Sequence, residues 1–191
     1  MPIFSRMEII QKKYQNLFKV YEILLKKNAI DTKFIIDWAD KVIDSPAEVN
    51  YVIIELASDS RNINDTISIL NSNTQNFNIE VVSRAVIGIL SHLLELGSIS
   101  INIVSLIINE IAYYKGLTDL ENTFLYGYGD FYDLAVQKIY GDLELISKEI
   151  KEFISFYGDF NFENYESWSQ INKNVKNKLP ENLKLLKVKY Y

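Results

Sequence analysis

The sequence predicts an all-α protein, either a multi-helix bundle or a short α-solenoid of stacked helical hairpins. Apolar residues recur at three- and four-residue spacing along most of the 191 residues. The stretch from 78 to 116 is almost free of charge and indicates two buried helices joined by a tight turn. Alternation of apolar and polar residues, which is typical of β-strands, appears only in short stretches such as 187–191. This length supports a packed core without disulfides or metal.

The central hairpin is the clearest element. From 79 to 96 the polar residues form one narrow stripe at helical spacing, so neighbours are expected to cover most of this helix. Gly97 follows where a left-handed residue closes a helix, and Ser98 or Ser100 can cap the next helix, 101–115. Charged residues interrupt the first of these helices, so neither is predicted to span a membrane.

The chain before the hairpin predicts four further helices. They are a long helix over 6–27, a second capped by Asp31, a third opened by the Ser45-Pro46-Ala47-Glu48 start signal, and a short helix around 65–70. An Asn-rich polar loop is expected from 71 to 78.

The sequence after the hairpin predicts shorter helices. The capping box from Thr118 to Glu121 opens a short helix that ends at Tyr126, and Gly127-Tyr128-Gly129 is interpreted as a break. Asp130 and Asp142 are then expected to cap two more helices, which run through Lys138 and to Gly158. The remainder indicates an aromatic loop and one or two weaker helices divided near Pro180.

An internal repeat is a further hypothesis. A shift of 69 residues aligns the apolar positions of the first two helices with those of the central hairpin. Two stacked copies of one unit would explain the match, although any two amphipathic hairpins with equal turns align in this way. We expect one all-helical domain over 1–191, alternatively divided into hairpin-containing halves 1–70 and 78–158 with an extension over 159–191.

Charge limits the classes of partner. The net charge is −5, with an acidic middle and basic ends. An acidic body attracts basic proteins and opposes nucleic acid, although the same charge also serves solubility. The lysines between 173 and 189 are interpreted as a solvated helix. Without cysteines, and without the pattern of a signal peptide in the first ten residues, the chain is expected to be cytoplasmic.

No catalytic or cofactor motif is present, and no metal or cofactor is expected. One segment is unusually rich in acids and tyrosines. It is a candidate interface because tyrosines give large contact area and carboxylates pair with basic residues. These residues form the candidate partner-binding set: Asp119, Glu121, Tyr126, Tyr128, Asp130, Tyr132, Asp133, Tyr140, Asp142 and Glu144. Alternatively, the acids are helix caps and the tyrosines core edges.

The segment FLYGYGDFYDLAVQKIYGDLELISKEIKEFISFY, residues 124–157, together with the helical build and acidity, resembles immunity proteins of bacterial polymorphic-toxin and contact-dependent inhibition systems. The resemblance implies a cytoplasmic, non-enzymatic inhibitor that occludes a cognate toxin domain, often a basic nuclease. It carries over no individual site residue.

Two alternatives stay open. One is a helical-repeat scaffold that binds another protein; oligomeric state is not predicted. The other is a bundle enzyme that uses carboxylates and a metal, for which the central hairpin offers Glu80, His92, Glu95 and Glu110. This second alternative expects Glu95 and Glu110 to face each other across the turn, but it lacks the repeated Glu-x-x-His pairs of metal-bearing bundles.

Overall fold

The computed structural model describes residues 3–45, 50–58 and 62–186 of the chain. All regular structure in these residues is helical, which confirms the predicted all-α class. The chain divides into two compact units, Met1–Asn78 and Ile79–Tyr191. The boundary falls where the second half was expected to begin, and residues 159–186 pack within the second unit.

The described residues of the first unit form four helices: α1 (Ile3–Lys26), α2 (Thr32–Ile43), α3 (Tyr51–Leu56) and α4 (Ile63–Ser72). Helix α1 packs against α4, and α2 against α3. The rings of Tyr14, Phe18 and Tyr21 from α1 meet Trp38 of α2, with centroids 5.5–6.0 Å apart. Asp31 caps α2 as predicted. The predicted start signal of the third helix includes residues 46–49, which lie outside the described residues, and α3 is capped by Asn50.

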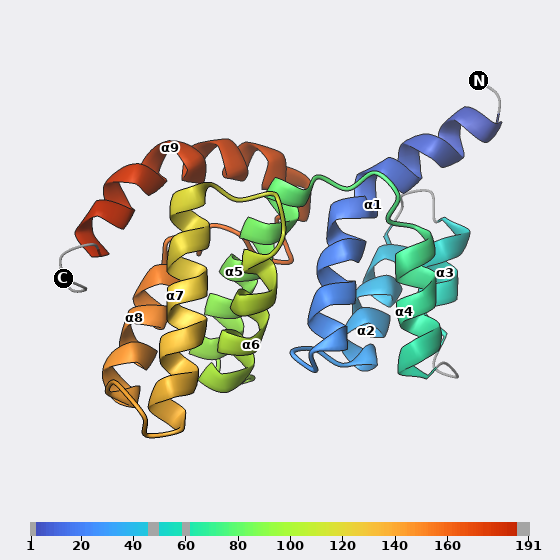
Figure 1. Cartoon of the computed structure of the whole chain (residues 1–191). Helices are drawn as coiled ribbons and strands as arrows, with labels where there is room; N and C mark the ends of the chain where they lie inside the picture. Colours follow the sequence, from blue (N-terminus) through green and yellow to red (C-terminus); the bar gives the residue numbers. More distant parts are fainter. Residues whose placement is uncertain (1–2, 46–49, 59–61, 187–191) are drawn as a thin grey trace. The chain divides into compact units, whose positions relative to one another are not determined.

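The second unit is a four-helix bundle crossed by a fifth α-helix (Figure 1). Its elements are α5 (Ile79–Glu95), α6 (Ile101–Ala112), α7 (Asp119–Val136), α8 (Leu143–Ser155), the short 3₁₀ helix η1 (Tyr165–Ser167) and α9 (Trp168–Leu186). Helix α5 contacts α6, α8 and α9, which explains why only a thin part of its surface is polar. Gly88 allows the closest approach, because a Cβ there would lie 2.2 Å from the carbonyl oxygen of Tyr157.

The two units share one pattern of helix neighbours. Contacts of α1 with α4, α2 with α3 and α3 with α4 recur as α5 with α8, α6 with α7 and α7 with α8. The hairpins also match at a shift of 69: first helices end at 26 and 95, and second helices span 32–43 and 101–112. Asn28 and Gly97 take the equivalent left-handed positions, with φ of 55° and 70°. This agreement supports the hypothesis of an internal duplication.

The predicted break at Gly127-Tyr128-Gly129 is wrong, because α7 runs unbroken from Asp119 to Val136. Asp130 therefore lies inside the helix and caps nothing. Gly129 is the point at which α7 approaches α6, since a Cβ there would be 2.9 Å from Cγ of Asn109. Close packing between the two helices offsets the low helix propensity of the glycines.

The predicted division near Pro180 is also wrong, because α9 continues from Trp168 to Leu186. Its buried stripe includes Val175, Leu179 and Leu183, so the packed face extends across the position of the proline. Burial of this stripe on both sides outweighs the backbone hydrogen bond that proline removes.

Candidate functional site

A buried ion pair lies at the centre of the second unit. Arg84 of α5 binds Glu121 of α7 with both arms of its guanidinium: Nε lies 2.8 Å from Oε1, and Nη2 lies 2.8 Å from Oε2. The exposed fractions are 1% for Arg84 and 0% for Glu121. A forked pair of this kind fixes both the distance and the rotation between two helices.

Glu121 also belongs to the capping box of α7, which the sequence predicted. Its Oε2 accepts hydrogen bonds from the backbone N–H and the hydroxyl of Thr118, at 2.8 and 2.7 Å. Its Oε1 accepts a third from the hydroxyl of Tyr157, two residues beyond the end of α8, at 3.0 Å. Every polar atom of this carboxylate is therefore engaged, although its interaction with Arg84 was not predicted.

The remaining side of Arg84 faces α9. Its Nη1 donates to Asn172 Oδ1 at 2.8 Å and to Glu80 of its own helix. Lys176 of α9 lies 3.0 Å from the same Glu80 oxygen. One buried guanidinium thus connects α5, α7 and α9 directly, and α8 through Glu121 and Tyr157. The six residues Glu80, Arg84, Glu121, Tyr157, Asn172 and Lys176 are called the Arg84 cluster below.

The positive and negative charges of the cluster balance each other, and this arrangement does not favour proton transfer. Burial alone would raise the pKa of Glu121, but the hydrogen bonds and charge of Arg84, with the two bonds from Thr118, lower it below 4.5. Burial and the charge of Glu121 raise the pKa of Tyr157 well above its usual range. At neutral pH the carboxylate stays ionised and the phenol stays protonated, so the cluster braces four helices.

The second feature of this unit is the turn between α7 and α8, residues 136–145, called the α7–α8 tip below. The N–H groups of Lys138 and Ile139 donate to the carbonyls of Ala135 and Leu134, at 3.1 and 3.0 Å. This is the pair of bonds that closes a helix when one residue is left-handed, and Lys138 has φ of 58°. Asp142 then caps α8, as predicted, by accepting from the N–H groups of Glu144 and Leu145.

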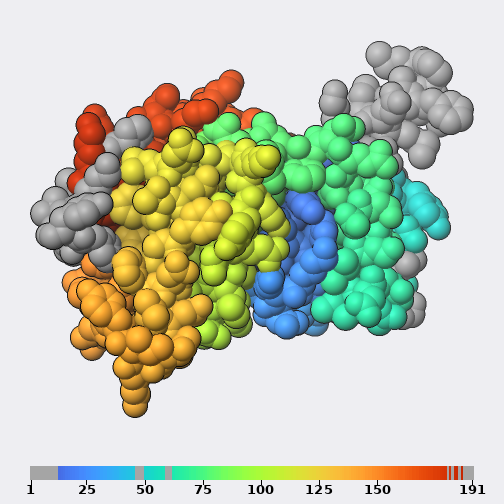
Figure 2. All heavy atoms as spheres, viewed as in Figure 1, coloured from blue at the N-terminus to red at the C-terminus, as the bar shows by residue number. Residues whose placement is uncertain are grey.

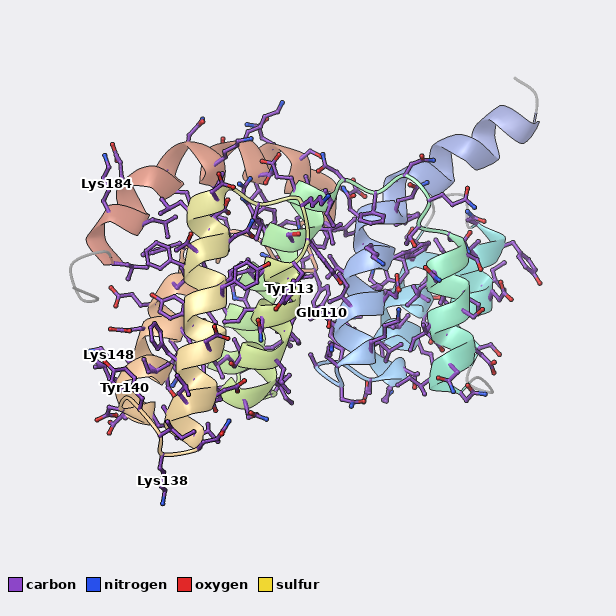
Figure 3. The ribbon with its side chains drawn as sticks, viewed as in Figure 1. Glu110, Tyr113, Lys138, Tyr140, Lys148 and Lys184 are labelled. Carbon is purple, nitrogen blue, oxygen red and sulfur yellow. The ribbon has the colours of Figure 1, made fainter. Side chains whose placement is uncertain are left out.

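Apolar side chains gather on the outside of this tip. Ile139 and Tyr140 are 66% and 67% exposed, and Val136, Leu143 and Leu145 are also exposed. Figure 3 shows Lys138 extending from the end of the turn, with Tyr140 farther up, near Lys148 of α8. In the space-filling view the tip projects beyond the rest of its unit (Figure 2). Contiguous exposed apolar groups of this kind mark interaction surfaces.

Carboxylates surround the apolar tip. Between residues 130 and 145 four acids, Asp130, Asp133, Asp142 and Glu144, stand against one lysine, Lys138. All five side chains are exposed. Residues 136–145 therefore combine apolar contact area with a net charge of −1, and Asp130 and Asp133 add two carboxylates on the last turns of α7 before them.

The ten predicted partner-binding residues divide into three groups. Asp130, Asp133, Tyr140, Asp142 and Glu144 lie exposed at or near the tip, and Asp119 is exposed at the other end of α7. Tyr126 is half-buried and packs edge-on against Tyr113, with ring centroids 5.0 Å apart.

The other three are corrections, because Glu121, Tyr128 and Tyr132 are buried in the core. Glu121 is held by Arg84 and Thr118, and Tyr128 packs on Phe153 with ring centroids 5.5 Å apart. These three side chains cannot contribute to a partner-binding surface in this structure. Conversely, sequence reasoning missed Ile139 and the other exposed aliphatic residues of the tip.

The residues of the metal-enzyme alternative do not come together. Glu110 lies nine residues beyond the start of α6, about 14 Å along the helix from the turn where Glu95 lies. Glu80 is bound to Arg84, and His92 Nε2 lies 2.8 Å from the carbonyl oxygen of Gly158. Among the described residues, no group of three or more histidines or carboxylates is placed to hold a metal ion.

Comparison with known protein families, curated proteins and solved structures gives no match. Within the part of the chain that the structure covers, every helix is too short or too polar to cross a membrane.

Proposed function

We propose that the chain is a non-enzymatic, cytoplasmic binding protein of the immunity type, which neutralises a basic bacterial toxin domain by covering part of its surface. The observation that supports this most is the α7–α8 tip, where exposed apolar and aromatic side chains lie with the carboxylates of Asp142 and Glu144, and Asp130 and Asp133 are exposed on the preceding turns of α7. The resemblance of residues 124–157 to immunity proteins supplies the class of partner.

The composition of the tip suits recognition of a basic protein. Tyrosine buries a large area at low entropic cost and is enriched among the residues that dominate the energy of interfaces, and the aliphatic side chains add apolar contact area. Surrounding carboxylates favour a partner of opposite charge and accelerate its association. The charge-matched Arg84 cluster holds the helices that carry the tip, so binding would require little ordering of the backbone.

The first test is a charge reversal at the tip. The triple variant Asp130→Lys, Asp133→Lys, Glu144→Lys should bind its partner with a slower association rate that depends less on salt, while keeping its helical content. The partner is first captured with the wild-type chain and then produced alone. It qualifies as a toxin only if its expression stops growth and the wild-type chain restores growth.

A matched control reverses three exposed acids outside the tip, Asp159, Glu163 and Glu166. This control changes the net charge by the same amount. It therefore distinguishes the effect of where the charges lie on the association rate from the effect of the total charge. Equal association rates for both variants and the wild type would remove the tip from the binding surface. Failure to protect cells from any basic protein that it binds would refute the inhibitor proposal.

The repeated order of helix neighbours favours one second candidate, a helical-repeat scaffold. Repeat proteins bind partners along an extended surface formed by several repeats. Small-angle scattering distinguishes the two, since a clearly elongated particle supports the scaffold and a compact particle supports the inhibitor.

A further inference from the structure

A second exposed surface of this unit lies on α6 and on the side of α7 beside it. Leu106 of α6 and Tyr113 at its C-terminal end are 54% and 70% exposed, although both side chains are large. They lie two helical turns apart on the same side of α6. The half-buried ring of Tyr126 from α7 packs edge-on against Tyr113. The surface made of Leu106, Tyr113 and Tyr126 is called the α6–α7 face below.

The first unit shows that this fold does not require large side chains on the outside of α6. At the shift of 69 residues that aligns the two hairpins, Leu106 and Tyr113 correspond to Asp37 and Asp44. Both aspartates are exposed, and Asp37 accepts a hydrogen bond from Lys33 at 2.9 Å. Equivalent positions therefore carry solvated charges in one unit and large uncharged side chains in the other. Packing within the unit does not explain this difference, whereas a contact made by the second unit does.

Unpaired carboxylates border the α6–α7 face. Asp119, Asp130 and Asp133 follow one another at spacings of eleven and three residues. This spacing places them on the side of α7 that carries Tyr126. All three are exposed, and none forms an ion pair within the part of the chain that the structure describes. Because α7 contains no lysine or arginine, this border is acidic along the length of the helix.

The outer face of α9 has the opposite charge. The buried stripe of α9 packs within its unit and leaves the other side of the helix in water. Three lysines outside the Arg84 cluster, Lys173, Lys178 and Lys184, are exposed there and form no ion pair with any residue in the described ranges. Lys184 points away from the bundle (Figure 3). They stand against one acid of this helix, Glu181.

The charges of the two helices also match in spacing. Asp119 and Asp130 are eleven residues apart in α7. Lys173 and Lys184 are likewise eleven residues apart in α9. Eleven residues make three helical turns and span about 16 Å, so two helices lying side by side bring both pairs of opposite charges together.

We infer that the α6–α7 face is a contact between copies of this chain, in which α9 of one copy lies along α7 of another. The lysines of α9 then meet the aspartates of α7, and their aliphatic stems cover the rings of Tyr113 and Tyr126. The occupant is a second copy because its α9 offers the matching charge at the matching spacing. This inference is independent of the proposed function, which concerns a foreign partner.

Such a contact is held mainly by charge, because the described residues of α9 include no exposed large apolar side chain. Exposed ion pairs are individually weak and are screened by salt. The association is therefore reversible, increases with protein concentration at low salt, and is lost at high salt.

Sedimentation equilibrium of the full-length chain tests this contact. At an ionic strength of about 0.01 M, the mean mass should rise above 22.2 kDa as the protein concentration increases, and at about 1 M it should return to that value, since the screening length falls about tenfold. Two charge reversals should each abolish the rise: Lys173→Glu, Lys184→Glu on α9, and Asp119→Lys, Asp130→Lys on α7. An equal mixture of these two variants should restore association, because each reversed row then meets a row of opposite charge.

A matched control reverses two exposed lysines of α8, Lys148→Glu and Lys151→Glu, and changes the net charge as much as the α9 variant does. It should associate like the wild type. Circular dichroism verifies that every variant keeps its helices. The variant Asp130→Lys, Asp133→Lys serves on α7 if reversal at position 119, in the first helical turn, unfolds the chain.

Three results would overturn the inference. They are a wild-type chain that stays monomeric at every concentration at low salt, a mixture of the two reversed variants that stays monomeric, and an α8 control that loses association as fully as the α9 variant. None of these results bears on the proposed function, which is decided by whether the chain protects cells from the partner that it binds.

Discussion

Replacing Arg84 with methionine should destabilise the second unit severely. The carboxylate of Glu121 is 0% exposed and would keep its bonds from Thr118 and Tyr157 but lose the guanidinium that binds both of its oxygens. Removing one member of a buried ion pair costs about 3–5 kcal/mol, because the remaining charge is left without compensation. With a urea dependence near 2 kcal/mol per molar, the unfolding midpoint would fall by about 2 M.

The tryptophans allow this loss to be assigned to one unit. The chain has two, Trp38 in α2 and Trp168 at the start of α9, and Trp168 is 1% exposed. In a Trp38→Phe background, fluorescence in urea follows the second unit alone. This matters because two units can unfold separately, and a single transition for the whole chain would not be interpretable.

The double variant Arg84→Met, Glu121→Leu provides the decisive comparison. Apolar replacement of both members of a buried pair is often nearly neutral, so this variant should be more stable than Arg84→Met alone. A change below about 1 kcal/mol for Arg84→Met would refute the assignment of the cluster as a brace. Additive effects of the two substitutions would refute the coupling between them.

Three further predictions concern the second unit and are measured as urea midpoints in the same background. Gly88→Ala should cost about 3 kcal/mol because its Cβ would meet the Tyr157 carbonyl, whereas Gly127→Ala, whose Cβ would lie 3.8 Å from a ring atom, should stabilise by about 0.5–1 kcal/mol. Equal effects would contradict the packing argument. Because the folded state lowers the pKa of Glu121 below its ordinary 4.5, its contribution is full above that pH and is lost as pH falls through the folded pKa; Glu121→Gln should flatten this slope. Lys138→Gly should stabilise by about 0.5–1 kcal/mol, because glycine adopts φ of 58° without strain, and a loss of stability would contradict the turn geometry.

Helix ends were the most predictable part of the fold. The capping box at Thr118, the caps at Asp142 and Ser100, and the left-handed Gly97 all depend on local chemistry and were found from short patterns. The predicted break at 127–129 is wrong because a glycine inside a closely packed helix does not end it.

A signal against that break was present. The buried positions of α7 include Glu121, Leu125, Tyr128, Tyr132 and Ala135, whose spacing of four, three, four and three is that of one unbroken helical stripe. Following the stripe through the glycines would have placed both tyrosines in the core. It would also have left the tip residues as the exposed part of the segment.

The Arg84 cluster could not be predicted in the same way. Only the spacing of Glu80 and Arg84, four residues apart on one helix, is visible locally. Arg84 and Glu121 are separated by 37 residues and meet only through packing of α5 with its neighbours. A polar stripe on a helix normally indicates a surface in contact with water. A buried guanidinium held by residues of neighbouring helices gives the same sequence pattern, so the sequence does not distinguish the two cases.

The Arg84 cluster also sets an order of events during protein synthesis. The first unit is complete in sequence at Asn78, and Arg84 follows almost at once, but Asn172 is translated 88 residues after Arg84. At 5–20 residues per second that interval is about 4–18 s. During this time α5 carries a cation for which only Glu80 is already present; Glu121 is made next, then Tyr157, which binds Glu121, and last Asn172. The cluster around the first helix of the second unit can therefore be completed only after residues of α9 have been made.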